Sequence, residues 1–401
     1  MRPAWIFAIA LAARLAFIAV HGVITTPDSS EYWRLARNIS SFHAFSTGAG
    51  APMEPSIARP PVYPLFLAFF TTTGAAAIAQ ALLDALVCAM LFLLASRVVR
   101  APFAAAVALL YALHPGAIAA SAIILSEGTF TVLLFAGVFL ALIAAERLSV
   151  ALAVCAGAAL GLATLSRSIG VIYLIAVGVV LFLRRFRTTA VVVVLAAAVV
   201  VAPWIVRTSR VVGRFVFIQA PSALPWYLPT LWWIDQNDEP AIWRYYLTED
   251  PYGITLHAAR GRAAEVMRAE DVGRRQAIVN VRKNPGAYLR SRMRSFPHLF
   301  LNTFDRFTGI NRALGDVNGM KLAIKLGLML LFTALPMAAA CLGLGASRRT
   351  LAGSLAAAMW MATLAVHVVM FIDYRYFLPV VPFQLVTAAL GMERIGRIWH
   401  R

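Results

Sequence analysis

A polar insertion at residues 25–64 interrupts an otherwise apolar sequence and decides how the chain is organised. It begins TTPDSSEYW at 25–33 and ends RPPVYP at 59–64, with apolar segments on both sides. A carboxylate such as that of Asp28, placed where an apolar helix leaves a membrane, costs free energy unless it has a partner or a function. The insertion therefore predicts a polar face at one side of a membrane.

Composition supports a membrane protein. Of 401 residues, 61% are hydrophobic and 13% are charged, and the mean hydropathy is +0.77. A soluble domain has roughly a quarter of its residues charged. Apolar runs recur along the chain, and one of about 20 residues crosses a bilayer as a helix. We therefore expect an all-α polytopic membrane protein.

Ten membrane spans are predicted. A separate apolar piece at 116–125 is too short to cross and is expected to be re-entrant or interfacial. Arg14 inside the first run, without an A-x-A-like site after it, indicates an uncleaved first helix. The spans cover residues 5–24, 76–94, 103–113, 128–145, 150–165, 170–183, 189–206, 320–344, 351–371 and 376–392.

The spans divide the chain into three expected parts. These are an N-terminal module at 1–206 with its first outer loop at 25–75, a soluble region at 207–319, and the C-terminal helices at 320–401. The soluble region is predicted to contain one or two polar helices over 261–294, broken near Asn284. Its early tryptophans suit an interface belt or a sugar platform; they are Trp226, Trp232, Trp233 and Trp243.

Arginine accounts for most of the positive charge. The chain has 36 basic and 18 acidic residues, a formal charge of +18, and lysine only at 283, 321 and 325. Arginines in short loops favour the cytoplasmic side, which places both termini in the cytoplasm and the insertion on the outer face. Arginine also binds phosphate bidentately, so both interpretations stay open. No nucleic-acid-binding module is found, and nucleic acid is not an expected partner.

The insertion predicts an amphipathic helix from Asp28 to Ser41, with apolar residues at 32, 35, 36 and 39 on one face. Asp28 suits a helix cap. It also lies four residues before Tyr32, on the same face, where its carboxylate is able to take a proton from an acceptor hydroxyl. Both roles are open at this point.

Other polar residues are expected on the same outer face. Arg59, Arg167 and Arg375 lie next to span ends, where they either flank the membrane or neutralise a phosphate group. Glu127 begins a span and is either a first-turn acid or a site residue. Within the spans, Arg14 and Asp84 lie at similar depth and are predicted to form a structural ion pair.

Several short motifs resemble the GT-C superfamily of polytopic glycosyltransferases, in particular the bacterial branch related to protein O-mannosyltransferases and the lipid A aminoarabinose transferase. They occur in the order of that family over nearly the whole chain. The motifs are DSSEY at 28–32 with ARN at 36–38, RPPVYP at 59–64, SE at 126–127, LSR at 165–167, PWIVR at 203–207 and RYFLPVVP at 375–382.

The resemblance implies that Asp28 is the catalytic base and that Arg59 and Arg375 hold a lipid phosphate. Many relatives have Asp-Glu here, whereas this chain has Asp28 followed by a serine. The second carboxylate is then Glu31 or Glu54. A divalent metal, Mg or Mn, is compatible with this pattern but not required, because arginine is able to neutralise the leaving group.

The combined expectation is an inverting transferase in the bacterial cytoplasmic membrane. It moves a sugar from a polyprenyl-phosphate donor to a glycan, lipid or protein acceptor on the extracytoplasmic face. Asp28 and Glu31 are the predicted catalytic residues. The predicted substrate-binding residues are Tyr32, Glu54, Arg59, Tyr63, Glu127, Arg167, Arg375 and Tyr376. The alternatives are a flippase or transporter of lipid-linked sugars and a catalytically silent scaffold.

Overall fold

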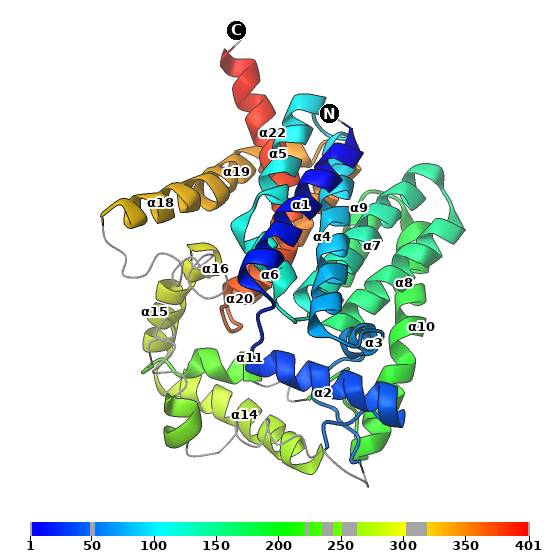
Figure 1. The fold of residues 1–401 in the computed structure, drawn as a ribbon, viewed down its shortest axis with the longest axis vertical. Helices are drawn as coiled ribbons and strands as arrows, with labels where there is room; N and C mark the ends of the chain where they lie inside the picture. Colours follow the sequence, from blue (N-terminus) through cyan, green and yellow to red (C-terminus); the bar gives the residue numbers. More distant parts are fainter. Residues whose placement is uncertain are drawn as a thin grey trace.

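The computed structural model describes residues 2–48, 53–220, 224–234, 244–250, 263–301 and 319–399. These residues form helices and no β-strand, and an isolated β-bridge joins Ile24 to Ile123. Figure 1 shows an upright helical bundle with both termini at one end. At the other end lie α2 (Pro27–Phe42), α11 (Leu224–Tyr227) and α14 (Ala263–Lys283). The all-α class predicted from composition is confirmed in the described residues.

The bundle consists of the apolar helices of the chain. Each of the ten predicted spans corresponds to one helix or to a set of consecutive helices. In order these are α1 (Pro3–His21), α4 (Thr73–Ala95), α5 (Ala101–Ala112), α7 (Glu127–Arg147), α8 (Val150–Ser166), α9 (Gly170–Leu183), α10 (Arg187–Val212), α18 to α19 (Gly319–Met329 and Leu335–Ser347), α20 (Leu351–His367) and α21 to α22 (Tyr374–Phe377 and Val381–Trp399).

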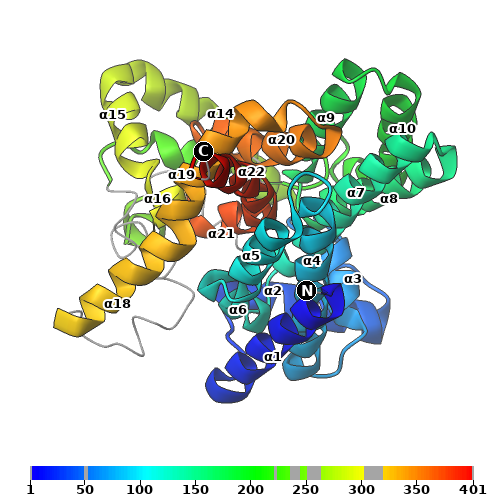
Figure 2. The same cartoon turned by 90° about the horizontal axis from the view of Figure 1, so that it is seen from above.

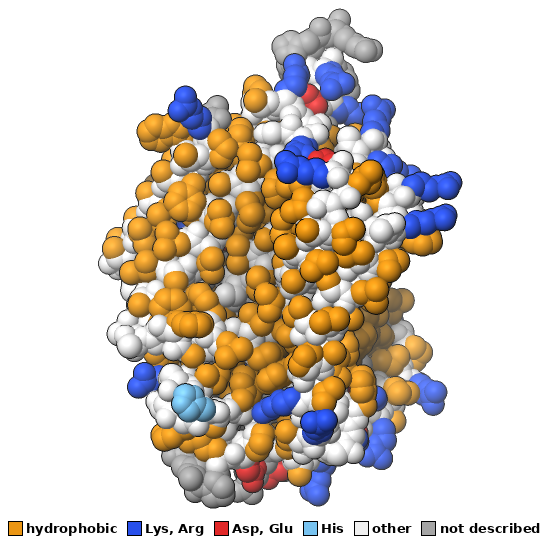
Figure 3. Space-filling model, turned by 90° about the vertical axis from the view of Figure 1, so that its right-hand side faces the viewer, with side chains coloured by type: hydrophobic (Ala, Val, Ile, Leu, Met, Phe, Trp, Pro, Cys, Tyr) orange, Lys and Arg blue, Asp and Glu red, His pale blue; other side chains and the backbone are white. Residues whose placement is uncertain are grey.

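Six spans in the described part of the chain are long and apolar enough to cross a membrane, or seven if α5 and α6 (Pro115–Ala122) count as one bent span. Helices α8, α9 and α20 are apolar but shorter. The count of ten therefore stays a prediction. In Figure 3 apolar side chains cover the middle of the molecule, and Lys and Arg gather towards its two ends. This distribution matches the hydrocarbon and headgroup layers of a bilayer, and the chain is an integral membrane protein.

One predicted break is confirmed, and one element boundary differs from the sequence-based expectation. Helices α5 and α6 meet at an angle of 45°, because Pro115 cannot continue α5 and the His114 ring accepts a hydrogen bond from Ala117 N at 3.3 Å to begin α6. Helix α10 continues past residue 206 to Val212, with Pro203 inside it. Its last turns therefore rise into the region expected to be soluble.

The region after α10 contains the polar helices α14 and α15 (Pro285–Ser295). The Asn284 side chain caps α15 by accepting a hydrogen bond from Ala287 N at 2.9 Å, so the predicted break near this residue is confirmed. Trp226 and Trp233 are about half exposed, as an interfacial position requires. Trp243 lies outside the described residues.

Close helix packing fixes the C-terminal half of the bundle. At Gly343 of α19 an added Cβ would lie 2.0 Å from the Thr387 carbonyl oxygen of α22, and at Gly391 of α22 it would lie 1.9 Å from the Ala339 carbonyl oxygen. Only glycine permits this backbone-to-backbone crossing. The crossing holds α22 at the centre of the bundle, where Figure 2 shows it surrounded by other helices.

The predicted ion pair between Arg14 of α1 and Asp84 of α4 is confirmed. Arg14 Nε donates to Asp84 Oδ2 at 2.6 Å, and its Nη1 donates to the carbonyl oxygens of Ala10 and Ala112, each at 2.9 Å. The Tyr111 hydroxyl donates to Asp84 Oδ1 at 2.9 Å. This inner cluster ties three helices together at points where an unpaired charge would be costly.

Candidate active site

The start of α2 determines where Asp28 lies. Thr26 is the N-cap: its hydroxyl accepts from Ser29 N at 3.2 Å, while Ser29 Oγ accepts from Thr26 N at 2.9 Å. This capping box satisfies the first turn of the helix. Of the two roles left open for Asp28, the helix cap is therefore wrong, because Thr26 already caps α2. The carboxylate of Asp28 is left to interact with other elements.

A backbone bridge places this helix start beside another. Ile24 N donates to the Ala122 carbonyl oxygen at 2.9 Å, and Ile124 N donates to the Ile24 carbonyl oxygen at 3.3 Å. Asp28 lies four residues after Ile24, and Glu127 lies four residues after Ile123, its partner in the bridge. The bridge thus places the first turns of α2 and α7 next to each other.

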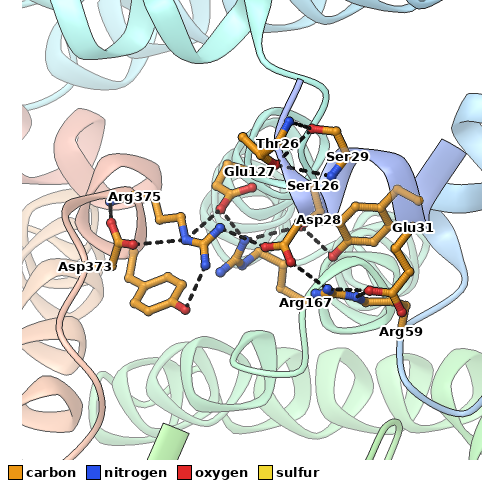
Figure 4. Close-up of polar contacts among 12 residues, drawn as sticks. Thr26, Asp28, Ser29, Glu31, Arg59, Ser126, Glu127, Arg167, Asp373 and Arg375 are labelled. Carbon is orange, nitrogen blue, oxygen red and sulfur yellow. Dashed lines mark hydrogen bonds and ion pairs between the residues drawn. The ribbon is translucent and has the colours of Figure 1, made fainter. Parts of the chain in front are cut away.

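Asp28 lies between two arginines that come from opposite ends of the sequence. Its Oδ1 accepts from Arg59 Nη2 at 2.7 Å and its Oδ2 accepts from Arg375 Nη1 at 3.0 Å. Figure 4 shows this carboxylate in the middle of a row of alternating acids and arginines. Asp28, Arg59 and Arg375, which the sequence predicts on one face, therefore contact one another in the structure.

Each of these arginines has a second carboxylate. Arg59 donates through Nε and Nη2 to Glu31 Oε2, at 2.8 and 2.6 Å. Arg375 Nε lies 3.3 Å from Asp373 Oδ2, and Asp373 also caps α21 by accepting from Arg375 N at 3.1 Å. The side chains of Glu31 and Asp373 therefore orient the two guanidinium groups that face Asp28.

Arg167 and Glu127 form a neighbouring pair. Arg167 Nη1 lies 2.6 Å from Glu127 Oε1 and donates to Ser126 Oγ at 3.2 Å. Arg375 Nε is 3.9 Å from the same Glu127 oxygen. The Glu127 side chain is only 5% exposed. Arg59, Arg167 and Arg375, which the sequence predicts on one face, thus lie against neighbouring carboxylates in the structure.

Aromatic rings line the cluster. The Arg59 guanidinium lies 4.9 Å from the ring centroid of Tyr32, and that ring packs edge-on against Tyr63 at 4.9 Å. The Tyr63 hydroxyl donates to Gln80 Oε1 at 2.7 Å. Tyr376 lies under the guanidinium groups of both Arg167 and Arg375. Tyr32 and Tyr376 pack against the guanidinium groups and fix the planes of the arginines.

The electrostatics of the cluster keep Asp28 ionised. Its side chain is 31% exposed, and those of Arg59 and Arg375 are 25% and 24% exposed. Partial burial raises the pKa of Asp28, but the positive charges of Arg59 and Arg375 outweigh it and hold the pKa well below its ordinary value. In the ligand-free site Asp28 is therefore a stable anion that binds two cations.

Arg207, in the PWIVR motif at 203–207, holds the polar insertion in place. The Arg207 guanidinium donates to the carbonyl oxygens of Ser56 and Phe45 and lies 4.7 Å from the Trp204 ring centroid. It therefore fastens the segment that leads to Arg59 onto α10. Glu54 in this segment is exposed and lies outside the acid–arginine cluster.

Sequence reasoning did not select three residues that the cluster uses: Asp373, Ser126 and Gln80. Asp373 lies two residues before Arg375, and a polar Gln80 within an apolar span was a usable signal. Gln80 Nε2 donates to the carbonyl oxygens of Ser121 and Ile123, at 3.1 and 2.9 Å. It therefore supports both Tyr63 and the segment that carries the bridge.

Comparisons with known proteins agree with this architecture. No protein-family model and no curated protein matches the sequence. The structure resembles the oligosaccharyltransferase of Archaeoglobus fulgidus in its apo form, with 18% identity, a TM-score of 0.55, and 99% of this chain aligned to 51% of that chain. It also resembles that archaeal enzyme, AglB, in complex with an inhibitory peptide and a dolichol-phosphate, with 14% identity, a TM-score of 0.54 and coverage of 99% and 51%.

Another solved structure that the chain resembles is ArnT from Cupriavidus metallidurans bound to undecaprenyl phosphate. It has 16% identity, a TM-score of 0.44 and coverage of 98% of this chain and 77% of that chain. The chain spans about half the length of the oligosaccharyltransferase it matches. The fold of the chain therefore resembles that of the oligosaccharyltransferase, in agreement with the GT-C-like fold predicted from the sequence motifs.

Proposed function

We propose that this protein is an inverting glycosyltransferase that moves one sugar from a polyprenyl-phosphate donor to an acceptor hydroxyl on the extracytoplasmic face of the cytoplasmic membrane. The observation that carries the proposal is the Asp28 carboxylate held between Arg59 and Arg375, at 2.7 and 3.0 Å. The Asp28 carboxylate is suited to accept a proton, and the two guanidinium groups are suited to bind a phosphate. All three lie at one end of the helical bundle. The GT-C-like fold supports this assignment.

The proton transfer is assigned to Asp28. Its carboxylate takes the proton of the acceptor hydroxyl as the acceptor oxygen attacks the anomeric carbon of the sugar. The bond from that carbon to the donor phosphate oxygen breaks on the opposite face, so the configuration inverts. The products are the glycosylated acceptor, protonated Asp28 and the free polyprenyl phosphate.

The leaving phosphate is assigned to the arginines. Negative charge grows on the phosphate oxygens as the bond breaks, and guanidinium groups already aimed at that place stabilise it without reorganisation. Arg59 and Arg375 are the nearest to Asp28, and Arg167 lies beside Arg375 across Glu127. AglB has been solved in complex with a dolichol-phosphate, which supports a lipid-phosphate donor here.

The proposed reaction does not require a metal ion. Among the described residues no three His, Cys, Asp or Glu side chains gather closely enough to hold one. The carboxylates of the cluster are instead directed at guanidinium groups. This donor set fits arginine neutralisation of the phosphate rather than a dedicated divalent-metal site.

The test is a transfer assay with the purified protein in lipid nanodiscs and a radiolabelled polyprenyl-phosphate sugar. We expect wild-type protein to release and transfer the sugar, and Asp28→Asn to be slower by about 10²- to 10⁴-fold, the usual contribution of a general base. The matched control is Asp271→Asn, which removes an exposed carboxylate paired with Arg214 on the same end of the molecule.

Transfer by Asp28→Asn at the wild-type rate contradicts the mechanism. Movement of the labelled donor across the bilayer without transfer favours a flippase instead. Absence of both, with a range of sugars and acceptors, favours the catalytically silent scaffold.

A further inference from the structure

The charge balance of the site raises a question about how an anion enters it. Within the described residues the acid–arginine cluster contains four carboxylates and three guanidinium groups, and each guanidinium lies against at least one carboxylate. The members are Asp28, Glu31, Glu127, Asp373, Arg59, Arg167 and Arg375. A phosphate group therefore meets no unpaired cation there. It has to replace a carboxylate that is already bound.

The carboxylates are not equivalent in this respect. Glu31 directs a single oxygen at two nitrogens of Arg59, and Asp373 holds Arg375 while capping the helix that carries it. Asp28 instead divides its two oxygens between Arg59 and Arg375. If Asp28 is released, each arginine keeps another acid. If Glu31 or Asp373 is removed, its arginine loses the group that orients it.

We propose that the donor phosphate displaces Asp28 from Arg59 and Arg375, so that the base becomes available only when the donor is bound, and that Asp373 is a positioning residue which keeps Arg375 aimed at the phosphate during this exchange. The proposal rests on the proposed function and deepens it. It makes the order of binding donor first and acceptor second.

The exchange has a chemical consequence for Asp28. While both arginines contact it, the carboxylate is a weak proton acceptor, as its lowered pKa indicates. When the phosphate takes the guanidinium groups, Asp28 loses its counter-charges and gains an anionic neighbour, and both changes make it a stronger base. The charged groups that face it from the packed elements are Glu31, Arg59, Glu127, Arg167, Asp373 and Arg375.

The test measures binding of undecaprenyl phosphate, without sugar, to the full chain in nanodiscs of neutral phosphatidylcholine. Removing the competitor in Asp28→Asn is expected to tighten binding about tenfold, in keeping with the loss of charged hydrogen bonds that wild-type protein has to break. Asp373→Asn retains the amide oxygen that caps α21 and is expected to weaken binding about tenfold.

The two variants form a matched pair because both remove one negative charge next to Arg375. General electrostatics predicts tighter anion binding for both, whereas the exchange predicts opposite signs. Inorganic phosphate, which has no lipid tail, serves as a second probe and separates the contribution of the phosphate group from that of the tail. If Asp28→Asn does not fold, Asp28→Ser replaces it.

Equal or weaker binding by Asp28→Asn overturns the displacement. Tighter binding by Asp373→Asn overturns its positioning role. Binding by neither wild-type protein nor Asp28→Asn counts against the proposed donor class itself, and so separates failure of the proposed function from failure of this exchange.

Discussion

Two clusters of acid and arginine in this protein have opposite designs. In the inner cluster Arg14 is fully buried and Asp84 nearly so, and backbone carbonyls and the Tyr111 hydroxyl make further hydrogen bonds to them. In the outer cluster the side chains of Asp28 and Arg59 are 31% and 25% exposed. One cluster has a single acid for a single arginine, and the other shares its acids among several arginines.

The difference separates a structural pair from an exchangeable one. A buried pair with no alternative partners has nowhere to go, since breaking it leaves an uncompensated charge in the bundle. A partly exposed acid that bridges two arginines can leave, because Glu31 and Asp373 remain on those arginines. Arginine–carboxylate contacts of similar length therefore serve different purposes in the two places.

The largest expected effect is on stability, and it tests the difference between the two clusters. Asp84→Leu leaves Arg14 unpaired in the bundle and is expected to lower the free energy of unfolding by about 3–5 kcal/mol. Asp28→Asn, at a partly exposed pair, is expected to change it by about 1 kcal/mol or less. Thermal unfolding in one detergent compares them. Equal losses for the two variants contradict the division into structural and exchangeable clusters.

A charge exchange sharpens the same point. The double variant Arg14→Asp with Asp84→Arg restores the opposite charges but not the carbonyl contacts that Arg14 makes on α1 and α5. We therefore expect it to recover part of the protein level lost by each single variant, on the order of 1–2 kcal/mol of the penalty for an unpaired charge. Membrane-fraction yield measures this. No recovery at all contradicts the pairing.

The pH dependence of transfer distinguishes the free and donor-bound states. The charges of Arg59 and Arg375 lower the pKa of Asp28 in the free protein, so kcat/KM for the donor should fall only below the ordinary carboxyl pKa of about 3.9. In the donor-bound protein the pKa of Asp28 rises, so kcat should begin to fall at a higher pH than kcat/KM does. Steady-state rates across the acidic pH range measure both limbs. Coincident limbs contradict donor-linked release of Asp28.

The smallest expected effect belongs to an exposed pair. Arg214 and Asp271 are 44% and 46% exposed in their side chains, and such pairs contribute about 0–1 kcal/mol. Arg214→Ala should therefore leave both thermal stability and transfer close to those of the wild type. A large loss of either would show that ion-pair exposure is a poor guide in this protein.

Much of the fold could be predicted from the sequence because the apolar runs determine where the helices form. The break at His114-Pro115 and the amphipathic helix after Pro27 were predicted for the same local reasons. The capping residue was not, because Thr26 and Asp28 are both good caps and the partner is a serine rather than the usual Glu or Gln. Span number depends on helix length near the limit for crossing, as in α8 and α9.

The site was predictable as a set but not in its pairing. Arginine counting placed Arg59, Arg167 and Arg375 on one face, and the structure brings them together. Which acid contacts which arginine depends on loop paths, which sequence spacing does not determine. For that reason Asp373 was overlooked. Glu54, on the same loop as Arg59, was included although it lies outside the cluster.

The bridge between Ile24 and Ile123 makes two short segments intolerant of changes in length. Each residue inserted at 25–27 or 124–126 rotates the helix that follows by about 100°, which turns Asp28 or Glu127 away from the arginines. A residue inserted near 54–55 has no such effect, because Glu54 and Pro55 are exposed and no helix begins directly after them. In an alignment of homologous chains, insertions and deletions should therefore be absent at 25–27 and 124–126 and frequent near 54–55.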